Sequence, residues 1–154
     1  MRTILAFVLV CVTGSAAFAQ TPPKNREEYM QKVLQIALDG IQNARCGSER
    51  CKPATAEEKK NPPLSLSETS MVVGRGIFSG GAAYCGLPWQ QRNFVPMIDY
   101  WSKEKKKNER QLALIAIVHN IMMEQIEKSF VGQGKCPEAI RKDVDSKLDF
   151  KPQG

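Results

Sequence analysis

The sequence contains a single histidine, His119, and lacks the residue spacings that usually carry chemistry. No second histidine supports a zinc site, and no two cysteines have the spacing of a redox or haem-attachment motif. A Ser-His-Asp spacing is missing, and no pair of carboxylates stands out from ordinary surface charge. Gly74-Arg75-Gly76 follows no predicted strand and lacks the residues that end a phosphate-binding loop. These absences favour a non-catalytic protein without a cofactor.

The sequence also lacks any stretch in which apolar and polar residues alternate for long enough to predict a sheet. After the first residues, the longest apolar run is 112–118, and it is interrupted by His119 and Asn120. That run is too short to span a membrane and predicts a core helix. We therefore expect an all-α fold, a compact bundle of four to five helices with two disulfides.

The N-terminus has the pattern of a secretory signal peptide. Arg2 precedes an apolar run, 4–12, and Ala17-Phe18-Ala19 supplies small residues at the positions that a signal peptidase reads. The alternative is a membrane anchor, for which the run is short. Residues 1–19 are predicted to be cleaved, leaving 20–154 as a single disulfide-stabilised helical domain in the periplasm or outside the cell. Export makes nucleic acid an unsuitable partner, although the net charge is +6.

Four cysteines remain after the leader, which holds Cys11. An even number of cysteines in an exported chain predicts two disulfides. Three pairings are possible, and we favour Cys46–Cys51 and Cys85–Cys136. The first would close a tight loop, and the second would join a glycine-rich stretch to the last helix.

Five stretches carry apolar residues at helical spacing. Three of these stretches begin with a residue that is expected to be an N-cap: Asn25, Ser65 and Asn108. The predicted helices are 26–45, 66–85, 88–101, 109–130 and 137–148. Between the first two lies a segment rich in charge and proline, 46–63, which we interpret as an exposed connector with room for a one-turn helix at 55–58.

The second predicted helix contains Gly74, Gly76, Gly80 and Gly81, although each glycine costs roughly 1 kcal/mol relative to alanine in a helix. A favourable interaction must offset this cost if the helix is to form. We expect close packing of bare backbone against the apolar helix 109–130. Further along, Pro96 is expected to kink its helix or to mark a restart.

His119 shares its helical face with Met122 and Met123. Histidine and methionine on one face can bind copper in an exported protein, and histidine is also the usual general base. Histidine and methionine also fill protein cores without any functional role. The favoured interpretation is a packed histidine that is hydrogen-bonded to a neighbouring helix.

The local cluster that most resembles a binding site consists of Trp89, Arg92 and Asn93, because an arginine beside a tryptophan recurs at binding surfaces. An arginine whose stem packs on the core rim is the alternative. The lysine-rich run 103–107 is interpreted as a solvated turn, with contact to an anionic surface as the alternative.

The sequence thus favours a non-catalytic binding or interaction module with an unidentified envelope or extracellular partner. A His119-centred enzyme or copper-binding protein is one alternative. An envelope-stress chaperone is another.

Overall fold

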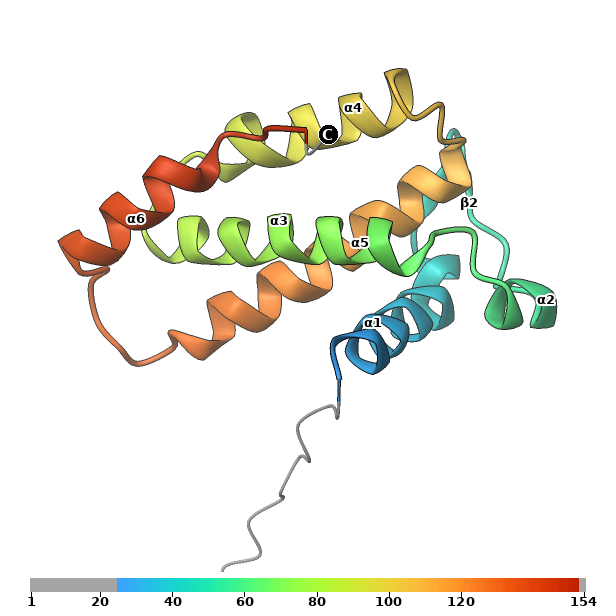
Figure 1. Ribbon diagram of the computed structural model, residues 1–154, viewed down its shortest axis with the longest axis horizontal. Helices are drawn as coiled ribbons and strands as arrows, with labels where there is room; N and C mark the ends of the chain where they lie inside the picture. Colours follow the sequence, from blue (N-terminus) through green and yellow to red (C-terminus); the bar gives the residue numbers. More distant parts are fainter. Residues whose placement is uncertain (1–24, 153–154) are drawn as a thin grey trace, which may run out of the picture.

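The structure is a computed structural model that describes residues 25–152 as a mostly helical chain (Figure 1). The chain contains two disulfides. The predicted signal peptide lies outside the described residues. The α-helices are α1 (Arg26–Gly40), α2 (Ala56–Lys60), α3 (Leu66–Tyr84), α4 (Val95–Lys103), α5 (Glu109–Ser129) and α6 (Glu138–Leu148). Within the described range no helix is long and apolar enough to cross a membrane.

The predicted helical class and the two disulfides are confirmed, but the expected count of four to five helices is too low. The additional α-helix is the short α2, which lies inside the predicted connector. A second difference is a two-stranded antiparallel hairpin, β1 (Arg45–Cys46) and β2 (Glu49–Arg50). Strands of two residues are too short to produce a recognisable alternation. The hairpin turns at Gly47, whose φ of +66° favours glycine.

Three helices begin at the capping residues that the sequence indicated. The side chain of Asn25 accepts a hydrogen bond from the Glu28 N–H at 2.8 Å. Ser65 and Asn108 each form a reciprocal capping box with the residue three positions on. The first helix is shorter than predicted, because α1 ends at Gly40 and a 3-10 turn, Ile41–Asn43, follows it.

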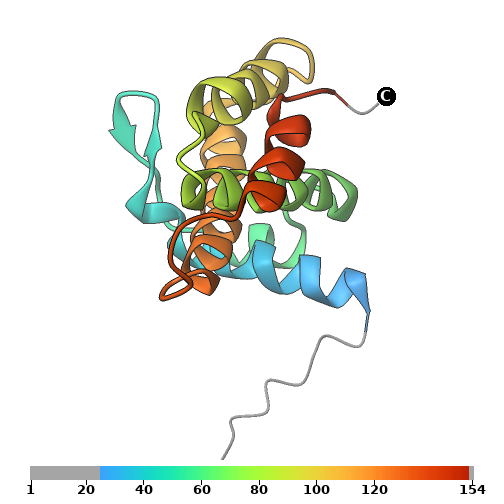
Figure 2. The same cartoon turned by 90° about the vertical axis from the view of Figure 1, so that its left-hand side faces the viewer.

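Helix α3 runs through the centre of the molecule, with α1 on one side and α4 and α6 on the other (Figures 1 and 2). Its largest contact is with α5. A Cβ atom added to Gly76 would lie 2.6 Å from the His119 carbonyl oxygen, and one added to Gly80 would lie 2.5 Å from the Met123 carbonyl oxygen. The predicted close packing against α5 is therefore confirmed for Gly76 and Gly80. It is wrong for Gly74, where an added Cβ would meet no atom within 4 Å, and for Gly81, whose added Cβ would lie 3.1 Å from Val144 of α6.

Pro96 lies in the first turn of α4, directly after a π-helical segment, Gln90–Phe94. Proline has no N–H, so the carbonyl oxygen of Arg92 loses the donor that an α-helix would supply from position 96. The N–H of Phe150 takes that place and donates to the Arg92 oxygen at 2.9 Å. The proline thereby leaves the Arg92 carbonyl oxygen available, and this oxygen holds the chain after α6 through Phe150.

The cysteines pair as the sequence favoured. Cys46–Cys51 closes the β1–β2 hairpin and is called the hairpin disulfide. Cys85–Cys136, called the helix disulfide, joins the end of α3 to the segment before α6. Cys85 belongs to a small apolar cluster with Val144 and Leu148 of α6. The helix disulfide and this cluster together fix α6 on α3.

Candidate functional site

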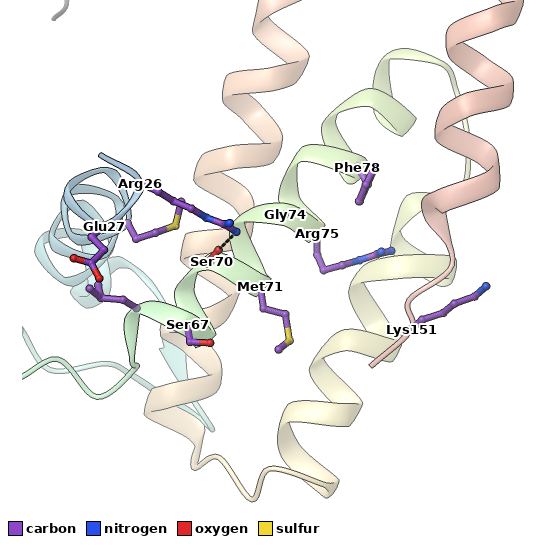
Figure 3. A pocket seen from close by; sticks show the side chains of 11 residues that line it. Arg26, Glu27, Ser67, Ser70, Met71, Gly74, Arg75, Phe78 and Lys151 are labelled. Atoms are coloured by element: carbon purple, nitrogen blue, oxygen red, sulfur yellow. Dashed lines mark hydrogen bonds between the residues drawn. The ribbon is translucent and has the colours of Figure 1, made fainter. Parts of the chain in front are cut away.

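A groove with a volume of about 530 Å³ lies between α1, α3 and the chain after α6 (Figure 3). Its polar lining includes Arg26 from α1, Ser70 and Arg75 from α3, and Lys151. Three elements that are distant in the sequence therefore supply its charges. Positive charge predominates, because Arg26, Arg75 and Lys151 line the groove together with one acidic residue, Glu27.

The floor of the groove is formed by α3 at Gly74. A Cβ atom added to Gly74 would meet no other atom within 4 Å, so this glycine faces open space, unlike Gly76 and Gly80. Met30, Met71 and Phe78 supply apolar side chains around the floor. The resulting surface combines bare backbone, flexible thioethers and an aromatic ring, which suits an irregular apolar ligand.

Arg26 spans the groove near the beginning of α1. Its guanidinium donates a hydrogen bond to the Ser70 hydroxyl at 2.5 Å, which links α1 to α3 (Figure 3). The Ser70 hydroxyl accepts this bond and keeps its own proton for a further partner. An arginine and a hydroxyl group in this position can together bind an anionic group.

Arg75 extends from α3 in the other direction, toward the end of α6 (Figure 3). Its guanidinium donates to the carbonyl oxygens of Lys147 and Leu148 in the last turn of α6, and its Nε–H donates to the Asn93 side chain. Burial lowers the pKa of Arg75, and the nearby charge of Asp149 opposes that effect. A cation at the carbonyl end of a helix is favourable, so Arg75 has a structural task as well as a place in the groove wall.

Behind Arg75 lies a polar network in which Asn93, Ser79 and His119 are fully buried. The Asn93 side-chain amide donates to the Arg75 carbonyl oxygen and to the Ser79 hydroxyl, both at 2.8 Å. The Ser79 oxygen is 2.9 Å from Nε2 of His119. On the other side of the ring, Nδ1 of His119 lies 3.2 Å from Oδ1 of Asn120. Each of these polar groups has a partner, as buried polar groups require.

The hydrogen bonds assign a direction to this network. Because the Asn120 oxygen can only accept, Nδ1 of His119 carries the proton and Nε2 accepts from the Ser79 hydroxyl. Burial lowers the pKa of His119 to about 4; the hydrogen bond to Asn120 raises it and the charge of Arg75 lowers it further. The imidazole is therefore neutral at pH 7. A proton on Nε2 would face the Ser79 oxygen and force its hydroxyl hydrogen to find another acceptor.

The structure brings His119 and its predicted neighbouring helix together, and it gives the Met122 sulfur a partner of its own. His119 bonds to Ser79 on α3, whereas the Met122 sulfur accepts from the Tyr29 hydroxyl of α1 at 3.0 Å. Met123 packs its backbone against Gly80. Among residues 25–152, no three histidine, cysteine, aspartate or glutamate side chains are placed to hold a metal ion.

The residues proposed as a local binding cluster have different surroundings. Asn93 is fully buried in the network. Arg92 pairs with Asp145 and, at 2.7 Å, with Asp149, and these hydrogen bonds raise its pKa. The ring of Trp89 lies 5.9 Å from the ring of His119, between centroids. Arg92 thus holds α6 and the chain after it, and it is not among the residues that line the groove.

In the lysine-rich run, Lys107 is held within the molecule, whereas Lys103, Lys105 and Lys106 are exposed. Lys107 pairs with Glu68 at 2.6 Å and only 14% of its side chain is exposed. Lys103 pairs with Asp99 on its own helix, and the Lys105 ammonium lies 5.6 Å from the centroid of the Tyr100 ring.

Sequence reasoning missed the groove residues Arg26, Ser70 and Lys151. The one available signal was Arg75, a cation between two glycines, and it was considered only as part of a phosphate-binding loop. Comparison of the chain with protein-family models, with curated proteins and with solved structures gave no match. The fold and the site define a disulfide-stabilised helical protein with a cationic groove that is also partly apolar.

Proposed function

We propose that the chain is an exported, non-catalytic binding module and that the groove between α1 and α3 is its ligand site. Two disulfides support export, because such bonds persist in oxidising compartments. The observation that carries the binding role is the groove itself. Its volume of about 530 Å³ lies within the roughly 300–1,000 Å³ of small-molecule sites.

The lining also fits a binding role. Small-molecule sites combine apolar surface with a few convergent polar groups that fix the ligand's orientation. Here Met30, Met71 and Phe78 supply the apolar part, and Arg26 with Ser70 supplies a polar anchor whose position is fixed by their mutual hydrogen bond.

Native mass spectrometry tests this proposal. The oxidised protein is incubated with an organic-solvent extract of the producing cells, and bound small molecules are detected as mass adducts. Gly74→Leu places a side chain in the open space of the groove and is expected to abolish the adducts. Gly40→Leu is the matched control, since a Cβ at Gly40 also meets no atom within 4 Å. Gly40 lies about 20 Å along α1 from Arg26.

Adducts that persist in Gly74→Leu, or no adduct with the unmodified protein, would contradict the proposal. A hydrolytic or redox activity of the purified protein would contradict its non-catalytic part.

An enzyme centred on His119 is the second candidate, because the Ser79 oxygen lies 2.9 Å from Nε2 of His119, within reach of a nucleophile–base pair. Both side chains are 0% exposed, however, and the Ser79 hydroxyl already accepts a hydrogen bond from the Asn93 amide. A fluorophosphonate, which labels activated serine hydroxyls, decides between the two candidates. We expect no modification at Ser79, and labelling that is lost in His119→Asn would favour the enzyme.

A further inference from the structure

We infer that the ligand of the groove is an anionic amphiphile, a small molecule with one negatively charged head group and an apolar chain. This inference rests on the proposed function and adds to it the chemical class of the ligand and the place of its head group. The head group is assigned to Arg26 and Ser70, and the chain to the apolar floor around Gly74.

Charge complementarity supports an anion. Arg26, Arg75 and Lys151 line the groove together with a single carboxylate, that of Glu27. A cationic ligand would face three like charges, and an uncharged ligand would leave the cations without a counter-charge. Hydrogen bonds between a guanidinium and an anionic oxygen are stronger than bonds between neutral groups.

The hydrogen bonds of the two arginines decide where the head group lies. Arg75 uses its Nε–H and both of its terminal nitrogens to hold Asn93 and the end of α6. Arg26 donates one hydrogen bond, to Ser70, and its side chain is otherwise available along the edge of α1. Of an arginine's five N–H groups, most therefore remain for a ligand at Arg26. The Ser70 hydroxyl can donate to the same head group.

Apolar side chains continue from this polar anchor along α3. Met71 and Gly74 follow Ser70 in the helix, and Phe78 lies one turn beyond Gly74. Residues three and four apart share a helical face, so these positions form a continuous strip. Met30 of α1 closes the strip on the other side. A chain that starts at Arg26 can therefore lie along α3 over bare backbone and thioether groups.

The test compares four compounds with eight carbons each, octanoate, octyl phosphate, octanol and octylammonium, at concentrations below micelle formation or, for octanol, below its solubility limit. Binding to the oxidised, isotope-labelled protein is followed by the amide chemical shifts of Ser70 and Gly74. The two anions are expected to bind at least about tenfold more tightly than octanol, as a charge-assisted hydrogen bond implies. Octylammonium is expected not to bind. The order of the two anions distinguishes a carboxylate source from a phosphate source.

Arg26→Gln locates the head group. It is expected to reduce the preference for octanoate over octanol to within about twofold, with octanol affinity unchanged. Lys128→Gln is the matched control, because it removes one exposed positive charge of α5 that pairs with Glu124 and does not line the groove. This control is expected to keep the full preference. Unchanged preference in Arg26→Gln would overturn the assignment of the head group.

Octanol binding as tightly as octanoate would overturn the anionic class and leave the groove as a binding site. If none of the four compounds shifts these amides while extract adducts still depend on Gly74, the ligand class is wrong and the proposed function stands. If the adducts are missing too, both fail.

Discussion

Alanine substitutions at Gly74 and Gly76 should change stability in opposite directions, although the two glycines lie two residues apart in the same helix. Both substitutions remove the flexibility of glycine from α3, which stabilises a helix by roughly 1 kcal/mol. At Gly74 the added methyl group meets no atom within 4 Å. We therefore expect Gly74→Ala to stabilise the protein by up to about 1 kcal/mol.

At Gly76 the same methyl group would lie 2.6 Å from the His119 carbonyl oxygen and 2.7 Å from the Met122 Cβ. Neither atom is the end of a flexible side chain, so α3 and α5 would have to move apart. Overpacking of this kind costs roughly 1–3 kcal/mol, and backbone contacts belong at the upper end of that range. After the gain in helix propensity, Gly76→Ala should lose about 2 kcal/mol. The two variants should differ by about 3 kcal/mol.

Urea denaturation of both variants at pH 7, with the disulfides intact and followed by far-ultraviolet circular dichroism, measures this difference. Gly80→Ala provides an internal check, because its methyl group would lie 2.5 Å from the Met123 carbonyl oxygen. It should resemble Gly76→Ala. If all three variants agreed within about 0.5 kcal/mol, the close contact between α3 and α5 would not depend on the glycines, and the packing argument would be refuted.

Three further predictions concern the buried network, the helix disulfide and the chain after α6. Because the pKa of His119 is about 4 when folded and about 6.5 when unfolded, the unfolded state binds more protons between these values. Stability should fall by roughly 2–3 kcal/mol from pH 6.5 to 4.5, and urea titrations of His119→Asn should show a much flatter profile. Replacing both cysteines of the helix disulfide with alanine should cost ~4 kcal/mol for its 51-residue separation, against ~2 for the hairpin disulfide with its separation of 5, as measured by the same denaturation assay. Pro96→Ala restores a helical donor that competes with the Phe150 N–H, so the Phe150 amide should exchange its hydrogen at least about tenfold faster; unchanged exchange would contradict the proposed role of the proline.

The features that were predicted correctly from the sequence depend on residues that are close to one another along the chain. Caps at Asn25, Ser65 and Asn108 work through residues three positions away, so they can be recognised without knowing the fold. The glycines of α3 could be interpreted from sequence only in part. Close packing against the apolar helix 109–130 was expected for all four and is found at Gly76 and Gly80, whereas Gly74 faces open space and Gly81 faces α6.

The groove could not be predicted in this way, because no local pattern brings its parts together. Arg26 meets Ser70 only through the angle at which α1 crosses α3. Lys151 reaches the groove because the chain after α6 is held by the hydrogen bond from the Phe150 N–H to the Arg92 carbonyl oxygen. We expect that bond in turn to depend on Pro96. The hydrogen bond from His119 to another helix was expected and is confirmed, but the identity of Ser79 as its partner depends on the register of α3 against α5.

The two arginines of the groove show why charge alone does not identify a binding residue. Arg75 is the more conspicuous in the sequence, yet its guanidinium is committed to Asn93 and to the last carbonyl groups of α6. A ligand that drew Arg75 away would leave the acceptors of the buried residues Asn93 and Leu148 unsatisfied, at a cost of roughly 1–3 kcal/mol each. Arg26 has no such commitment beyond one exposed bond to Ser70. The groove therefore combines a fixed cation that builds its wall with an available cation that can bind a ligand.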